Sequence, residues 1–317
     1  MSGVIGFVLA VLVYPGLVVA LIAAVVLGWV RDATRGAVAG TGVSHPLRLV
    51  RDARSMLTVD STEPDTHPLA LTLGTYAAVL VPVLALVFLP VPGNPLVTSI
   101  GQSSDIILEG ALLLGMPLAR LFLGWATPSA QTRLAADREA RAVAGAVIPM
   151  ALALSVTSMQ IDTALFGAPP AAGNTLALAG RVVAALAFAC ALPVLARGTS
   201  LVFGESPLDT PGNELAELSG HDLVLVRIGE AIQLAAVSAF FVTAFIVPIA
   251  AGVPSGAGLA ALWVLCLLAT AAGIGLWQGF TGTRIEGRDR APLTWWMGVP
   301  VLLALVALVA ATWGHRG

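Results

Sequence analysis

The feature that most constrains this chain is the recurrence of apolar runs of roughly 20 residues, the length needed to cross a bilayer. Inside hydrocarbon, backbone amide and carbonyl groups have no water to bond, so each run must satisfy them within itself as an α-helix. The runs lack the alternation of apolar and polar residues that a membrane barrel requires. Because 57% of the 317 residues are hydrophobic, the sequence predicts an all-α integral membrane protein.

We expect about eight transmembrane helices in a single polytopic domain that covers residues 1–317. The first apolar run has no basic leader, and its core is too long for a cleaved signal peptide, so it should remain as a helix. The expected spans are residues 4–30, 69–91, 106–125, 140–159, 176–195, 231–251, 259–277 and 295–313.

The arginines indicate how these spans are oriented. All sixteen basic residues are Arg, and thirteen of them fall in connections that would share one face of the membrane. The positive-inside rule makes that face cytoplasmic. An even number of spans then places both termini outside. We therefore expect a multi-pass protein of the cell inner (plasma) membrane, and the net charge of −2 gives no basic surplus for nucleic acid.

One polar segment, residues 31–68, should contain a basic amphipathic helix. Apolar side chains at Val50, Ala53 and Met56 follow helical spacing, while Arg51 and Arg54 occupy the other face. Such a helix is suited to lying on the cytoplasmic lipid surface. The alternative is a short helix that packs on another part of the protein.

Two charged residues fall inside the third expected span. A charge at mid-membrane costs roughly 2.5–3.5 kcal/mol on insertion scales, so such residues usually face protein or water. Glu109 is an intramembrane charge that is either functional or interfacial. Arg120 should snorkel to the nearer interface.

The sequence carries no pattern for catalysis by this chain alone. Cys190 and Cys266 are isolated within apolar runs, where cysteine packs as a small apolar residue. No spaced Cys/His set, nucleophile–base pair, phosphate loop or dinucleotide fingerprint is present, so we expect no metal and no cofactor bound by this chain alone.

The polar stretch from Glu205 to Asp222 is the most unusual part of a chain that is only 11% charged, because it contains five carboxylates. It connects the fifth and sixth spans and should form an acidic cytoplasmic loop. Thr210–Pro211 is a good start for a short helix, on which Glu214 and Glu217 would share a face. Like charges so close would favour proton exchange once partly desolvated. The candidate coupling or docking residues are Asp209, Glu214, Glu217, Asp222 and Glu230; the plain alternative is a solvated connector.

This stretch also contains sequence patterns of a known family. Pro207–Leu208–Asp209–Thr210–Pro211 and Glu217–Leu218–Ser219–Gly220 resemble the proline–x–aspartate–x–proline and glutamate–tyrosine–serine–glycine signatures of membrane subunit 1 of complex I, the NADH-quinone oxidoreductase. Upstream, Gly124–Trp125 and Arg138 with Glu139 resemble the family's glycine–tryptophan pair and the arginine that opens its fourth helix. The pairing of Arg138 with Glu139 resembles the hydrogenase and formate hydrogenlyase membrane anchors, one branch of this family.

The resemblance implies a membrane-anchor subunit of a complex I-like oxidoreductase or energy-converting hydrogenase. Its implied partners are the bilayer, peripheral hydrogenase-like or quinone-reductase-like subunits that carry iron–sulfur clusters, and antiporter-like membrane subunits. The subunit would dock the redox module and couple electron transfer to quinone reduction or proton translocation. The sequence departs from the family at Val147, where a membrane-embedded glutamate is usual and which cannot titrate.

A second class of function stays open, namely a stand-alone polytopic transporter or a structural membrane protein. A transporter would be expected to show inverted repeats and broken helices with titratable residues at mid-membrane. Prolines do interrupt the expected spans, but no repeat accompanies them.

Overall fold

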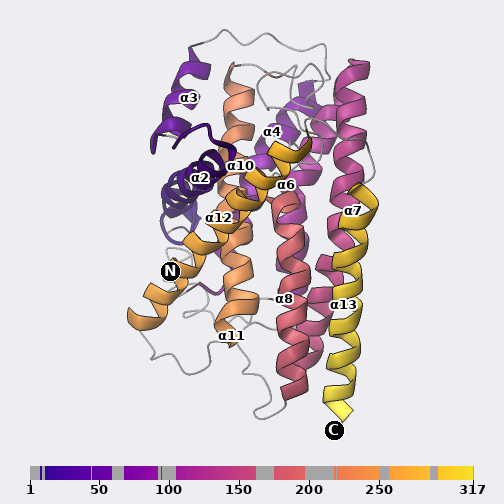
Figure 1. Cartoon of the computed structure of the whole chain (residues 1–317). Coiled ribbons are helices and arrows are strands. Elements are labelled where there is room, and N and C mark those ends of the chain that lie inside the picture. The colour runs from indigo at the N-terminus through magenta and orange to yellow at the C-terminus, as the bar shows by residue number, and fades with distance from the viewer. Residues whose placement is uncertain are drawn as a thin grey trace.

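The computed structural model describes residues 8, 11–43, 45–58, 68–91, 94, 105–161, 175–196, 218, 220–249, 257–285 and 292–316. Within these ranges every regular element is helical, as Figure 1 shows. The elements are α2 (Leu17–Ala39), α3 (Arg48–Leu57), α4 (Pro68–Phe88), α6 (Ile106–Ala126), α7 (Ala130–Ile161), α8 (Thr175–Leu195), α10 (Gly220–Phe241), the π-helical turn η1 (Val242–Ile246), α11 (Val247–Ile249), α12 (Ala257–Ile285) and α13 (Pro292–Arg316).

Seven of the described helices contain stretches long and apolar enough to cross a membrane, and α13 adds a shorter apolar stretch, Gly298–Thr312. The expectation of an all-α membrane protein is therefore confirmed, with seven full-length candidates and one shorter one. The short helix expected in the basic segment is present as α3. The acidic stretch up to residue 217 lies outside the described residues.

The first membrane helix begins and ends later than the expected 4–30. Helix α2 starts at Leu17, directly after Pro15 and Gly16, and continues to Ala39. It ends at Gly40, whose φ of 71° is in the left-handed region that glycine adopts without steric cost. Arg31 and Arg35, expected in a connection, are consequently helical.

Helices α7 and α10, in contrast, begin before the apolar runs that predicted them. The structure starts α7 at Ala130 and α10 at Gly220, whereas the expected spans start at residues 140 and 231. Hydropathy marks where a helix becomes apolar and not where its backbone hydrogen bonding begins. The extra turns carry charged side chains into helical positions, and among these are Glu139 and Glu230.

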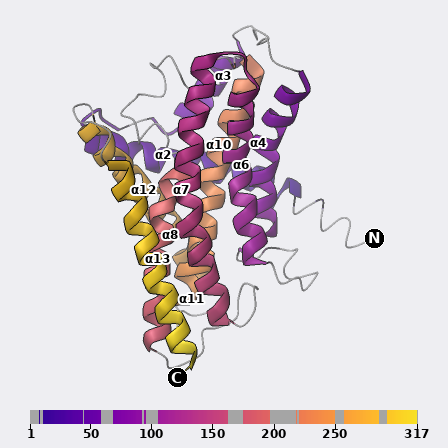
Figure 2. The same cartoon turned by 90° about the vertical axis from the view of Figure 1, so that its right-hand side faces the viewer.

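Helix α10 is the centre of the bundle, because it contacts α2, α3, α4, α6, α8 and α12. In Figure 1, α7, α8, α10 and α13 run roughly parallel to one another, whereas α12 crosses them obliquely and α2 is seen almost end-on. The view in Figure 2 shows α7, α8 and α13 side by side, and these three contact one another.

Glycine residues permit close contacts between α10 and α4 and between α12 and α2. A Cβ on Gly229 of α10 would collide with the carbonyl oxygen of Ala78 on α4. A Cβ on Gly275 of α12 would collide with Thr34 Oγ1 and with the Arg31 carbonyl oxygen on α2. Small residues that let backbones approach are a common basis of helix association in membranes, where lipid removes the hydrophobic driving force.

The end of α4 is fixed by the side chain of Asn94. The side-chain nitrogen Nδ2 of Asn94 donates to the carbonyl oxygens of Val87, at 2.9 Å, and Leu89, at 2.8 Å. Val87 lies in the last turn of α4, where carbonyl oxygens have no intrahelical partner. Asn94 is 1% exposed, so this cap is an internal feature of the bundle.

Candidate functional site

Four charged side chains meet inside the bundle and form what we call the ion-pair cluster: Arg120, Glu139, Arg227 and Glu230. Arg120 Nη2 donates to Glu139 Oε2 at 3.0 Å, and Arg120 Nε lies 3.5 Å from Glu230 Oε1. Arg227 Nη1 donates to Glu230 Oε2 at 3.0 Å. The cluster joins α6, α7 and α10 and contains two positive and two negative groups, so it is neutral overall.

The cluster is buried, which determines its energetics. The side chains of Arg120, Glu139 and Glu230 are 2%, 3% and 5% exposed, and that of Arg227 is 17% exposed. Removing charges from water costs several kcal/mol per ion, and only close, hydrogen-bonded pairing offsets that cost. Each carboxylate therefore depends on its arginines, and a change in one member is expected to disturb the others.

The α6–α7 connection sets the register that brings Arg120 to Glu139. Trp125 Nε1 donates to Asp137 Oδ1 at 2.8 Å, and Arg133 Nε donates to the carbonyl oxygen of Thr127 at 2.8 Å. These contacts tie the end of α6 to the start of α7. The two helices run antiparallel from this connection, so residues at similar distances from it face each other.

One turn beyond the cluster, Gln233 links three helices. Its Nε2 donates to the carbonyl oxygen of Leu113 on α6 at 2.7 Å and to that of Leu195 on α8 at 3.3 Å. Its Oε1 has no hydrogen-bond partner among the described residues, and neither has the hydroxyl of Ser238, one to two turns further along α10. The polar interior of α10 thus continues past the charged cluster.

Glu109 is a separate buried carboxyl group near the other end of α6. It is 1% exposed, and neither of its oxygens has a hydrogen-bond partner within the described ranges. It lies in the first turn of α6, where the helix dipole favours a negative charge by about 1 kcal/mol. Burying an unpaired carboxylate costs several kcal/mol, so burial outweighs the dipole.

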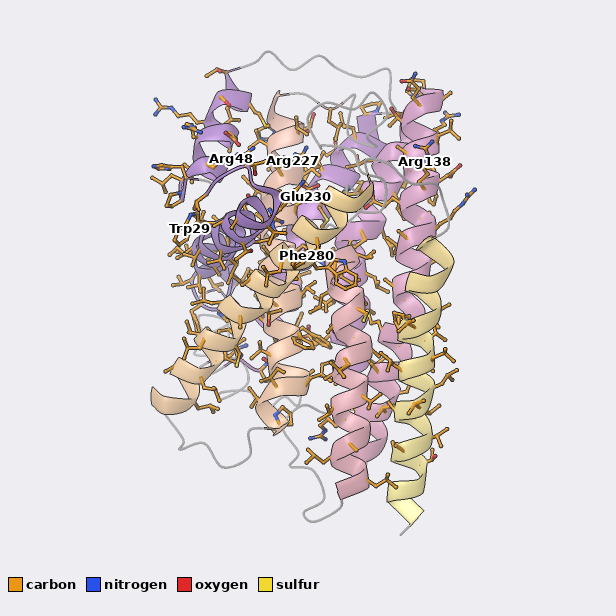
Figure 3. The ribbon with its side chains drawn as sticks, viewed as in Figure 1. Trp29, Arg48, Arg138, Arg227, Glu230 and Phe280 are labelled. Atoms are coloured by element: carbon orange, nitrogen blue, oxygen red, sulfur yellow. The ribbon has the colours of Figure 1, made fainter. Side chains whose placement is uncertain are left out.

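The candidate residues from the sequence are distributed unevenly over this geometry. Asp209, Glu214 and Glu217 lie outside the described residues. Asp222 is in the first turn of α10 and Glu230 is in its interior, so both are helical residues rather than loop residues. Of the pair on α7, Glu139 is in the cluster, whereas the neighbouring Arg138 is exposed. Figure 3 shows Arg138, Arg227 and Glu230 toward the same end of the bundle as α3.

The expectation that Arg120 snorkels to an interface is wrong. Its guanidinium points into the bundle because Glu139 and Glu230 are there to pair with it. Arg227 was missed altogether. The signal for the first pair was available, since Arg120 and Glu139 are nearly equidistant from the polar connection at Thr127–Ser129. Opposite charges placed so on antiparallel helices would meet.

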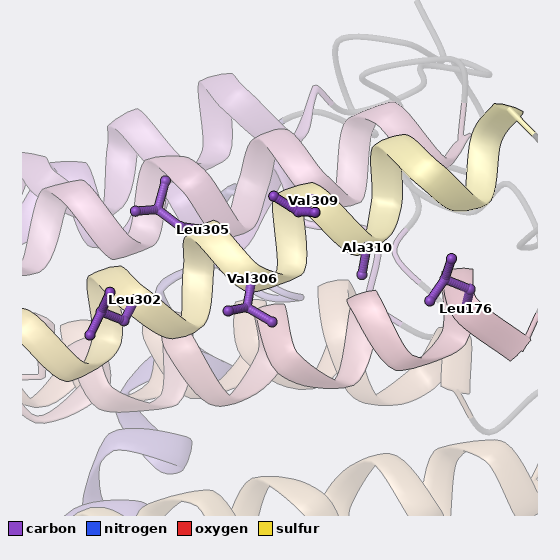
Figure 4. Close-up of a pocket in the computed structure, with 6 residues that line it drawn as sticks. All are labelled: Leu176, Leu302, Leu305, Val306, Val309 and Ala310. Atoms are coloured by element: carbon purple, nitrogen blue, oxygen red, sulfur yellow. The ribbon is translucent and has the colours of Figure 1, made fainter.

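An apolar groove lies between α8 and α13, away from the cluster (Figure 4). Its volume is about 410 Å³, and it is lined by Leu176, Leu302, Leu305, Val306, Val309 and Ala310. These side chains offer no hydrogen-bond donor to the carbonyl oxygens of a quinone, so this groove does not fit a quinone head group. The described residues also contain no group of three His, Cys, Asp or Glu side chains that could hold a metal ion.

Comparisons with known proteins agree with this architecture. Residues 3–310 match the protein family described as NADH dehydrogenase. No curated protein matches the sequence. Among solved structures, the chain is similar to one from the membrane-bound sulfane sulfur reductase, an archaeal respiratory membrane complex, with a TM-score of 0.68 and 18% identity over 96% of this chain and 99% of that one. The family match spans nearly the whole sequence, and the chain therefore belongs to the NADH dehydrogenase family, that of complex I membrane subunit 1.

Proposed function

We propose that this chain docks a peripheral iron–sulfur redox module onto the membrane and transmits the charge changes of that module to the buried ion-pair cluster. Family membership identifies it more coarsely as a membrane subunit of a complex I-like oxidoreductase. The docking and coupling roles go beyond that statement. We further propose that antiporter-like membrane subunits are its partners within the bilayer.

The ion-pair cluster is the observation that carries the proposal. It is neutral as long as each member keeps its proton state, and its two carboxylates pair with Arg120 and Arg227. At an effective dielectric constant of about 20, a unit charge about 10 Å away changes the energy of a carboxylate by about 1–2 kcal/mol. That corresponds to about tenfold in proton occupancy. A charge that the docked redox module gains near the cluster would therefore cause proton uptake or release by its carboxylates.

The position of the cluster supports docking at the same end of the bundle. Helix α10, which carries Arg227 and Glu230, begins at Gly220, three residues after Glu217 of the acidic stretch. Arg48 and Arg138 lie toward this end in Figure 3. A concentration of arginine favours the cytoplasmic side, where a soluble redox module would bind. We propose accordingly that the termini lie outside.

The acidic stretch provides the direct test. In the native complex, D209N, E214Q and E217Q together would remove three charges with little change in size. Loss of the peripheral subunits from the purified complex would support docking, and a complete complex with lowered proton translocation per electron would support coupling. The matched control is D52N. Asp52 is a carboxylate of α3 that is 44% exposed, so this variant should change neither the retention of the peripheral subunits nor the proton translocation per electron. A complete, fully coupled triple variant would refute the proposal.

A further inference from the structure

The carboxyl group of Glu109 has no role in the ion-pair cluster. Glu109 precedes Arg120 by eleven positions on α6, which corresponds to about 16 Å along the helix axis. The arginines of the cluster are thus too far away to pair with it, and none of the ion pairs among the described residues includes Glu109. Its two oxygens are nevertheless enclosed by the protein.

The N-terminus of α6 does not satisfy Glu109 either. Asp105 caps this helix, because its Oδ1 accepts from the backbone amides of Ile107 at 2.8 Å and Leu108 at 3.4 Å. The amide of Glu109 itself donates to the carbonyl oxygen of Asp105 at 3.0 Å. The backbone amides of Ile107, Leu108 and Glu109 are therefore all committed to Asp105.

The helices packed around α6 offer few charges to Glu109. Helix α4 contains one titratable side chain, Tyr76, which is 51% exposed. Helix α7 carries all its charges between residues 133 and 141, near the cluster. Helix α8 contributes Arg181 and Cys190, and α10 contributes His221, Asp222, Arg227 and Glu230. The next residue of α6, Gly110, faces Met150 and Leu154 of α7.

Uncharged polar groups lie between Glu109 and the cluster. Gln233 is anchored at Leu113, four positions from Glu109 and so about 6 Å along α6. Ser238 lies five positions beyond Gln233 on α10, which brings it to about the level of Glu109 because α6 and α10 run antiparallel. Gln233 Oε1 and Ser238 Oγ have no partner among the described residues. Residues five positions apart on an α-helix lie about 140° apart around its axis, so Gln233 and Ser238 offer two separate uncommitted polar atoms rather than one continuous row.

We propose that Glu109 is a proton-binding site inside the bundle, held as the neutral carboxylic acid. Proton binding is favoured over a metal cation because hard cations take six or more oxygen ligands, whereas neither carboxyl oxygen of Glu109 has a polar partner among the described residues. Binding converts the carboxylate and one proton into the neutral acid, which can exist in this apolar setting without a counter-ion.

Carbodiimide labelling of the full chain in native membranes tests the proposal. The reagent used is dicyclohexylcarbodiimide, whose central carbon bonds to a carboxyl oxygen while the carboxyl proton moves to its nitrogen. Mass spectrometry of the peptides should find Glu109 labelled at least about tenfold more than the ion-paired Glu139 and Glu230. The labelling should not change when Na⁺ replaces K⁺. Protection by Na⁺ would overturn the proposal in favour of a cation site.

Infrared spectroscopy of the purified protein tests the same group without depending on reagent access. The wild-type spectrum should contain the carbonyl stretching band of a protonated carboxyl that E109Q lacks. E139Q should retain the band. A wild-type-minus-E109Q difference spectrum with no such band would overturn the proposal. Neither measurement involves the peripheral subunits, so failure here leaves the docking proposal standing, and the converse also holds.

Discussion

Removing Arg120 should destabilise the protein far more than removing an exposed arginine. The substitution R120M removes the arginine that pairs with Glu139 and Glu230, whose side chains are 3% and 5% exposed. Breaking a buried pair by removing one partner costs about 3–5 kcal/mol. The control R48M removes an arginine that is 49% exposed and paired with an equally accessible Asp52. Its expected cost is within about 0.5 kcal/mol.

A second substitution, E139Q, tests whether it destabilises the wild type and stabilises R120M. E139Q on its own should cost about 1–3 kcal/mol, because it removes one hydrogen-bonded carboxylate. In the R120M background, the same change restores charge balance around Glu230 and Arg227, so it should recover about 1–3 kcal/mol of the loss. The coupling between the two substitutions is therefore expected to be large and favourable.

The assay is reversible unfolding of the purified chain in mixed micelles, followed by the fluorescence of its seven tryptophans. It yields the free energy of unfolding of wild type, both single variants, the double variant and R48M. Additive losses from R120M and E139Q would refute the claim that the cluster is one interdependent unit. An R120M loss no greater than that of R48M would refute its burial.

Three further substitutions test helix packing and helix capping elsewhere in the bundle, and each is checked by the same unfolding measurement. G275A should cost about 1–3 kcal/mol because its Cβ meets Thr34 and the Arg31 carbonyl, whereas G273A on the same helix meets nothing within 4 Å and should be neutral or slightly stabilising; equal effects would contradict the close α2–α12 contact. N94A should cost about 1–3 kcal/mol because it leaves the Val87 and Leu89 carbonyls without their buried donor, and an unchanged stability would show that this cap is dispensable. D105A should cost about 1 kcal/mol through loss of the α6 cap, and no loss would mean that other donors or acceptors replace it.

The sequence was sufficient for the class of fold because apolar length is a direct consequence of bilayer thickness. It was less informative about where helices begin, since α7 and α10 extend beyond their apolar runs into charged sequence. Those extensions are stable because the charges in them find partners, such as Glu139 with Arg120. Hydropathy treats each charge as a cost and cannot show that it is paired.

The sequence predicted only part of the candidate site, because hydropathy does not show which charges are paired. Glu139 and Glu230 were singled out from motifs, but Arg120 was assigned to an interface and Arg227 was missed. Whether a charged residue faces lipid or protein depends on which helix lies opposite, and that contact involves residues far apart in sequence. The connection between α6 and α7 was the one place where antiparallel spacing could have predicted the Arg120–Glu139 pair.

The most direct test of the central proposal is to purify the tagged chain from its native membranes in mild detergent and identify what accompanies it by mass spectrometry. We predict that iron–sulfur subunits of an oxidoreductase and antiporter-like membrane subunits are recovered in fixed proportion with it. The E109Q variant should recover the same set, because Glu109 lies away from the docking end. Recovery of the chain alone, or only with copies of itself, would contradict the anchor function and favour a stand-alone membrane protein.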